Sequence, residues 1–137
     1  MTDFSTYFNK HSVFKLAPVD ISKMNKNVQL ILLPDEKIIG VYKKVRDRVI
    51  FTDKRIIDIE VQGVTGTKQK FFNFPYSKIQ YFAAQTPGMA DGSFVRDSEI
   101  AICFANGAEV IFEFKAANGI TDTGILQIAK TISNYVL

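Results

Sequence analysis

The sequence predicts a mainly β domain in which seven antiparallel strands run between a short helix and a closing amphipathic helix. Two observations predict this class. Apolar and polar residues alternate with period two through the middle of the chain, and a helical period of three and four returns near its C-terminal end. Twelve Phe and five Tyr, many beside Ile or Val and with no Trp, are typical of strands. The length of 137 residues suits one domain with its own core.

Residues 1–17 show no periodicity, and we expect them to form a loosely ordered extension. The pattern then becomes helical, and Asp20 or Ser22 can cap a short helix. We therefore divide the chain into an N-terminal extension with a short helix, residues 1–33, and a domain that spans residues 34–137. The extension can dock on this domain through three phenylalanines, Phe4, Phe8 and Phe14.

Seven short segments with strand-like alternation follow, separated by turn residues. In the third segment Ile57, Ile59 and Val61 alternate with polar neighbours, which predicts a hairpin with one solvated face. Asn106-Gly107 predicts a tight turn in which both central residues have positive φ. Residues 86–97 are expected to form a loop. The predicted strands comprise residues 38–42, 48–52, 55–62, 68–74, 79–85, 99–104 and 109–114.

An apolar stripe at spacings of three and four predicts the closing helix. Thr121 or Asp122 can cap its start. Seven antiparallel strands of this length curl into a bent barrel or two near-orthogonal sheets, and an amphipathic helix can close one end. The stripe consists of Ile125, Ile128, Ala129, Ile132 and Val136.

Five short motifs between residues 32 and 82 are distinctive as a set. They are an acidic residue before the first strand, Arg46-Asp47, Phe51-Thr52-x-x-Arg55, Gly63-x-x-Gly66-x-Lys68 and Pro75-Tyr76-x-x-Ile79. With the order of the elements, these motifs resemble the bacterial pleckstrin-homology-like (PH-like) domain family over about residues 30–137. The resemblance implies a PH-like bent barrel closed by the C-terminal helix. It also implies a small non-catalytic domain that often forms ring-shaped homo-oligomers and whose ligand is generally unknown.

Three basic residues, Lys44, Arg46 and Arg48, lie around the turn between the first two predicted strands. They are similar to the Lys-x-Arg-x-Arg pattern with which some eukaryotic PH domains hold inositol phosphates through charge-assisted hydrogen bonds. Asp47 stands in the middle of this pattern and would repel a phosphate. The alternative is that Arg46 or Arg48 pairs with Asp47 or another acid of the hairpin and fixes its register, each exposed pair contributing about 0–1 kcal/mol.

Consecutive apolar residues on a strand place one side chain outward, because neighbours point to opposite faces. Phe71 beside Phe72 is one such case, and we expect Ile56 to point outward as well. Outward apolar side chains indicate either cover by the N-terminal segment or an oligomer interface. The candidate interface residues are Phe71, Tyr76, Phe82 and Ile111.

No catalytic residues, metal ligands or cofactors are predicted. His11 is the only histidine, and the single cysteine, Cys103, lies in an apolar run that is typical of a core. Gly63-Val64-Thr65-Gly66 lacks the spacing and the following helix of a phosphate-binding loop. Three carboxylates near one loop lack the spacing of a calcium-binding loop: Asp91, Asp97 and Glu99.

We therefore expect a cytoplasmic, non-catalytic binding and assembly module that forms homo-oligomers, with a ring as one form and an unidentified protein as a further partner. A net charge of +3 with dispersed basic residues does not indicate a nucleic-acid partner. No apolar run is long enough to span a membrane, so membrane contact is expected to be peripheral at most. The alternatives are a phosphoinositide or anionic-lipid domain, a small-molecule carrier and a single-strand nucleic-acid binder.

Overall fold

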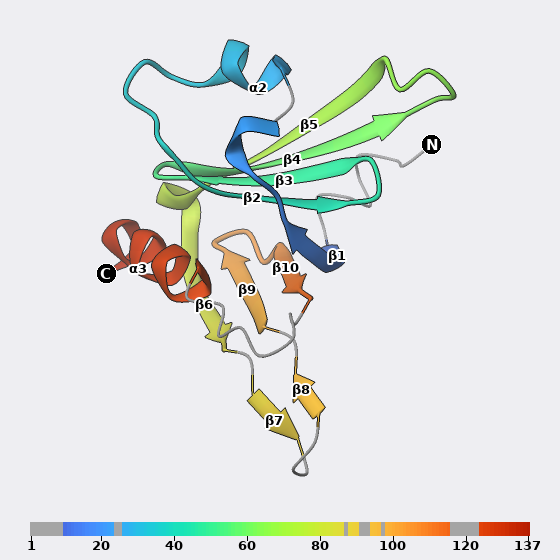
Figure 1. The fold of residues 1–137 in the computed structure, drawn as a ribbon. Coiled ribbons are helices and arrows are strands. Elements are labelled where there is room, and N and C mark those ends of the chain that lie inside the picture. Colours follow the sequence, from blue (N-terminus) through green and yellow to red (C-terminus); the bar gives the residue numbers. More distant parts are fainter. Residues whose placement is uncertain (1–9, 24–25, 87, 91–93, 97, 116–123) are drawn as a thin grey trace. The chain divides into compact units, whose positions relative to one another are not determined.

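The computed structural model in Figure 1 describes residues 10–23, 26–86, 88–90, 94–96, 98–115 and 124–137. The chain divides into two compact units. One unit comprises Ala17–Tyr76, and the other comprises residues 1–16 together with Ser77–Leu137. Strand β1 (Lys10–Pro18) spans this boundary, because its residues up to Leu16 belong to the second unit and its last two residues belong to the first.

The unit Ala17–Tyr76 contains an antiparallel meander in which consecutive strands pair in the order β2, β3, β4, β5. The last two residues of β1 pair with β2. A short 3-10 turn, η1, and one helix, α2, precede the meander, and the 3-10 turn η2 (Tyr76–Lys78) follows it. The bounds are η1 Ile21–Lys23, α2 Lys26–Ile31, β2 Ile38–Lys44, β3 Asp47–Thr52, β4 Arg55–Gln62 and β5 Lys68–Pro75.

Both faces of this meander carry buried side chains. On one face the α2 residue Val28 joins a buried apolar cluster from β2, β3 and β4. On the other face Tyr42 meets Phe51 edge to face, with ring centroids 5.6 Å apart. Ile56, which was expected to point outward, lies fully buried on the same face as Phe51, its cross-strand partner, so it presents no exposed apolar surface. The cluster with Val28 contains Val41, Ile50, Ile57 and Ile59.

In the other unit β10 (Glu109–Phe114) is the central strand. It pairs in parallel with the first part of β1 and antiparallel with β9 (Ser98–Phe104), which in turn pairs with β6 (Ile79–Gln85). Helix α3 (Gly124–Val136) packs against β6 and β9 and buries Ile125, Ile128 and Ile132. The short strands β7 (Gly88–Ala90) and β8 (Phe94–Arg96) form a separate ribbon.

All seven predicted strands are present, as β2 to β6, β9 and β10, and the closing helix buries three residues of its predicted stripe, Ile125, Ile128 and Ile132, while Ala129 and Val136 are half-buried. The segment expected to be loosely ordered contains β1, which was missed. Its alternation is broken by an irregularity between Val13 and Leu16, where Lys15 has a φ of 59°. A bulge of this kind shifts side chains between faces, so no period of two is visible in the sequence.

Three smaller predictions needed correction. The N-terminal helix is divided into η1 and α2; Asp20 accepts a hydrogen bond from the Ser22 N–H at 3.0 Å, as expected of a cap. The predicted loop 86–97 contains β7 and β8. In the Asn106-Gly107 turn only Gly107 has positive φ. The Gly107 N–H donates to the Phe104 carbonyl and the Phe104 N–H donates to the Ala108 carbonyl, so the hairpin has a three-residue loop instead of a two-residue one.

Candidate functional site

The buried carboxylate of Glu36 lies at the end of the meander where β3 turns into β4. Its side chain is fully inaccessible and receives four hydrogen bonds. Arg55 donates from Nε to Oε2 and from Nη2 to Oε1, both at 2.9 Å, so the pair is bidentate. Thr52 Oγ1 donates to Oε2 at 2.6 Å and the Leu33 N–H donates to Oε1 at 3.1 Å. Every oxygen of this carboxylate is therefore used inside the fold.

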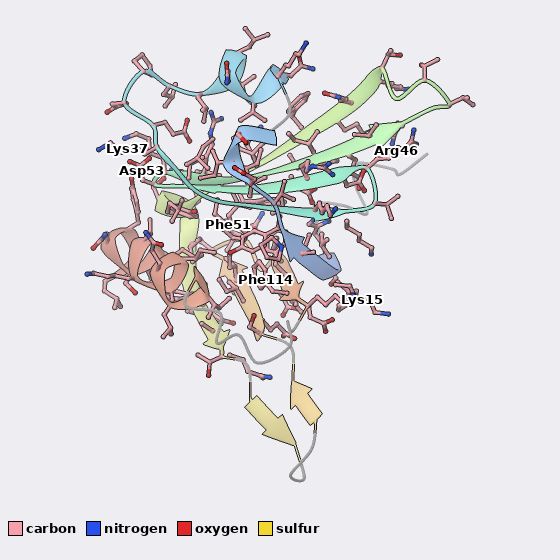
Figure 2. The ribbon with its side chains drawn as sticks, in the orientation of Figure 1. Lys15, Lys37, Arg46, Phe51, Asp53 and Phe114 are labelled. Atoms are coloured by element: carbon pink, nitrogen blue, oxygen red, sulfur yellow. The ribbon has the colours of Figure 1, made fainter. Side chains whose placement is uncertain are left out.

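The same arginine ties together three further segments. Arg55 Nη2 donates to the carbonyl of Ile31 at the end of α2, 2.7 Å away, and Nη1 donates to Asn73 Oδ1 on β5 at 3.0 Å. Beside it, the Lys37 and Asp53 residues labelled in Figure 2 exchange hydrogen bonds: the Lys37 N–H donates to Asp53 Oδ1 and the Asp53 N–H donates to the Lys37 carbonyl. The arrangement holds α2, the loop before β2 and the β3–β4 turn together, and it leaves no open position for a ligand at the carboxylate.

This geometry shifts the pKa of Glu36. Burial by itself raises the pKa, but the hydrogen bonds from Arg55, Thr52 and the Leu33 N–H, with the charge of Arg55, outweigh it, so the pKa of Glu36 lies below its ordinary value of 4.5. A lowered folded-state pKa means that ionised Glu36 stabilises the fold above pH 4.5 and that this stabilisation is lost as the pH falls through the folded-state pKa.

We therefore expect the free energy of unfolding to decrease as the pH falls below about 4.5, and the decrease to be smaller in Glu36→Gln, which has no proton to gain at this position. Urea unfolding followed by circular dichroism between pH 3 and pH 7 measures the difference. The variant should be less stable than the parent at pH 7, and the two curves should converge at low pH. Parallel curves would show that Glu36 does not contribute to the acid sensitivity.

At the opposite end of the meander the β2–β3 and β4–β5 turns are joined by hydrogen bonds. Arg46, labelled in Figure 2, donates from Nη1 to the carbonyl of Gly63 at 2.7 Å. Asp47 Oδ1 accepts from the Val61 N–H on β4 at 2.8 Å. Arg48 donates to the carbonyls of Val45 and Asp47, at 3.3 and 2.9 Å. These charged side chains thus bond to the backbone and hold the register of the hairpins.

The predicted anion site consists of Lys44, Arg46 and Arg48, which differ in their exposure. Lys44 and Arg46 are exposed, whereas Arg48 is half-buried and its Nη1 bonds to carbonyls beneath the turn. Arg46 and Arg48 each use guanidinium N–H groups on backbone carbonyls of the turns. Asp47, which was expected to repel a phosphate, is half-buried with Oδ1 bonded to the Val61 N–H. Arg46 or Arg48 was expected to fix the hairpin register by pairing with an acid. In the contacts that the structure gives, the two arginines bond to backbone carbonyls and Asp47 bonds to a backbone N–H.

The candidate interface residues lie in different surroundings. Tyr76 is fully buried, and its hydroxyl donates to the carbonyl of Thr52 at 2.7 Å, so Tyr76 has no exposed surface to offer a partner. Phe71 is half-buried and packs against the cluster around Val28. Phe82 on β6 and Ile111 on β10 are half-buried.

Strand β6 offers a surface that the residue patterns did not single out. It carries no charged residue, and five of its seven side chains are exposed. Tyr81, 62% exposed, lies opposite Cys103 on β9, and the Cys103 side chain beside it raises the pKa of Tyr81. A run of seven residues without charge at a predicted strand was the sequence signal that could have found this surface.

Chemistry-bearing side chains are not gathered elsewhere in the described ranges. No group of three or more His, Cys, Asp or Glu side chains there could hold a metal ion. His11 is buried on β1 and meets Phe112 edge to face. Glu99 lies on β9, whereas Asp91 and Asp97 fall outside the described residues. None of the described helices is both long and apolar enough to cross a membrane.

Comparison with known proteins identifies relatives of this chain. A family model described as "Bacterial PH domain" matches residues 7–136. The uncharacterized protein YjqA of Bacillus subtilis (strain 168) is 42% identical over 95 residues, which are 67% of this chain and 72% of YjqA. A crystal structure of a protein with a pleckstrin-homology domain from Shewanella loihica PV-4 has a TM-score of 0.64 and 29% identity, over 91% of this chain and all of that one. A pleckstrin homology domain from Shewanella amazonensis SB2B has a TM-score of 0.54 and 35% identity, over 87% of this chain and 90% of that chain.

Proposed function

Because this chain belongs to the bacterial PH domain family, we propose that it is a non-catalytic, cytoplasmic binding and assembly module that self-associates through strand β6. Its fold class is the predicted one, mainly β and PH-like with a C-terminal amphipathic helix; β1 brings the number of strands, apart from the β7–β8 ribbon, to eight instead of seven. The observation that supports self-association is an uncharged, exposed edge on β6.

The backbone of β6 has hydrogen-bonding groups that point away from β9. The Phe104 N–H donates to the Ala108 carbonyl, so Phe104 and every second residue before it bond to β10. The residues between them on β9 bond to β6 at Tyr81, Ala83 and Gln85. The N–H and C=O groups of Phe82 and Ala84 are therefore directed outward, and among the described strands β6 pairs with β9 alone.

The outer strand of the other unit provides a contrast. Strand β5 pairs with β4 alone among the described strands, but it carries Lys68, Lys70 and a terminal Pro75. Lysine and proline on an outer strand disfavour pairing with another chain, whereas an uncharged outer strand such as β6 favours it. We therefore assign the contact to β6 and its occupant to a strand of a second copy.

The number of subunits follows from which strand β6 meets. Pairing with β6 of a second copy is two-fold and gives a dimer, whereas a head-to-tail contact of β6 with a different strand of the next copy gives a ring where the rotation between copies closes. The mass in solution, measured by light scattering after size exclusion, separates the two forms. A strict monomer at all concentrations would contradict the proposal.

The matched pair Ala84→Pro and Ala84→Val tests the role of β6. Proline at position 84 removes an outward N–H without breaking a bond to β9, so the mass should fall to that of the monomer while the melting temperature of the monomer changes little. Valine keeps the N–H and favours strands, and it should keep the oligomer. An oligomer that survives Ala84→Pro would place the contact elsewhere.

A further inference from the structure

The turn between β9 and β10 places an asparagine directly before a glycine. Asn106 and Gly107 are both exposed, and a Cβ added at Gly107 would find no heavy atom within 4 Å, so this side of the turn is open. In such a pair the glycine nitrogen can attack the side-chain carbonyl carbon of the asparagine, because glycine has no Cβ that hinders the approach. The turn therefore carries a reactive pair that the proposed function does not use.

The reaction of this pair is deamidation, which needs only water as a second reactant. The Gly107 nitrogen loses its proton and forms a bond to Cγ of Asn106, while the bond from Cγ to the side-chain nitrogen breaks and ammonia leaves. The product is a five-membered cyclic imide, which water opens at either of its two carbonyls. One opening gives aspartate at position 106, and the other gives isoaspartate, in which the main chain runs through the former Cγ.

The closed turn engages both reacting groups in hydrogen bonds. The Gly107 N–H donates to the Phe104 carbonyl at 2.9 Å, and Asn106 Oδ1 accepts from the Ala108 N–H at 3.0 Å. A hydrogen-bonded N–H loses its proton only after the bond opens, as in amide hydrogen exchange. Gly107 has a φ of 89°, which glycine adopts without strain, so the closed turn is relaxed. Deamidation therefore requires the turn to open.

The buried core begins close to this turn. Val110 on β10 lies opposite Ile102 on β9, and the two side chains are 2% and 1% exposed. A single pair, Cys103 with Glu109, separates them from the turn. Fraying that starts at the turn thus reaches the buried pair after one step. Packing of Ile102 and Val110 therefore helps to keep the turn closed.

We propose that Asn106 is a deamidation site that the closed β9–β10 hairpin protects, so that opening of the hairpin sets the rate of the reaction. Aspartate at position 106 keeps an oxygen for the Ala108 N–H and adds a negative charge to the turn. Isoaspartate lengthens the main chain by a methylene group, so the three-residue loop no longer fits the bond from Phe104 to Ala108. The site converts a transient opening into a lasting change at the end of β9, the strand that pairs with β6.

Peptide mapping by mass spectrometry tests the protection. The whole chain is incubated in mildly alkaline buffer, with and without concentrated urea, and the conversion of amide to acid at position 106 is followed over time. The folded chain should react about tenfold or more slowly than the unfolded chain, because hydrogen bonds of the turn must break first. A synthetic peptide of residues 103–110 in each solvent corrects for the effect of urea on the chemistry. Equal corrected rates would overturn the proposal.

A matched pair of variants tests the link to opening of the hairpin. Ile102→Val trims the buried pair beside the turn and should raise the rate in the folded chain about two- to tenfold. Leu126→Ala changes an exposed side chain on α3 and should leave the rate as it is. In urea both variants should react like the parent, because Asn106 and Gly107 are unchanged. A folded-state rate that Ile102→Val does not alter would contradict control by the hairpin.

Discussion

Replacing Arg55 by alanine is expected to lower the free energy of unfolding by about 3–5 kcal/mol, because the buried carboxylate of Glu36 then loses its bidentate partner. The same change removes hydrogen bonds to Ile31 and Asn73, so α2 and β5 lose a common anchor. A loss of this size is a large share of the stability of a typical domain. Urea unfolding at pH 7, followed by circular dichroism, gives the value.

The neighbouring Lys54→Ala variant is the matched control. Lys54 forms an ion pair with Asp35 at 3.6 Å, and the side chains are 34% and 81% exposed. Solvent screens such a pair, so its loss should cost at most about 1 kcal/mol. If Arg55→Ala were no more destabilising than Lys54→Ala, the network around Glu36 would not be a stabilising centre of this unit.

Replacing Tyr76 by alanine is expected to cost about 3–5 kcal/mol of unfolding free energy, because a fully buried aromatic ring is removed. Tyr76→Phe keeps the ring and removes only the hydroxyl, so it should cost about 1–3 kcal/mol through the unpaired Thr52 carbonyl. Urea unfolding measures the loss of unfolding free energy in both variants and shows whether Tyr76→Ala loses more than Tyr76→Phe.

The same variants decide between a core role and an interface role for Tyr76. A core residue should lower the stability of the protein while the mass of Tyr76→Phe in solution stays that of the parent. An interface residue should do the reverse, with a lower mass and unchanged unfolding of the separated subunits. The second result would contradict the placement of Tyr76 in the structure.

The family motifs could be found from the sequence, but their roles could not. Thr52 and Arg55 were visible as Phe-Thr-x-x-Arg, and Glu36 as an acid before a strand. Only the fold brings the three together, because they come from a loop, the end of β3 and the start of β4. The same holds for Asp47, whose charge was expected to oppose a phosphate and whose Oδ1 instead bonds to the Val61 N–H.

Local pattern by itself determined the seven strands and the closing helix, since the alternation of side chains is a property of neighbouring residues. It also determined the family, through motifs that lie within 51 consecutive residues. Tertiary structure decided the rest. Strand β1 forms because β10 offers it an edge, although its own pattern is interrupted at Lys15. The exposure of β6 likewise depends on which elements lie beside it, and a sequence period carries no information about partners that are distant in the chain.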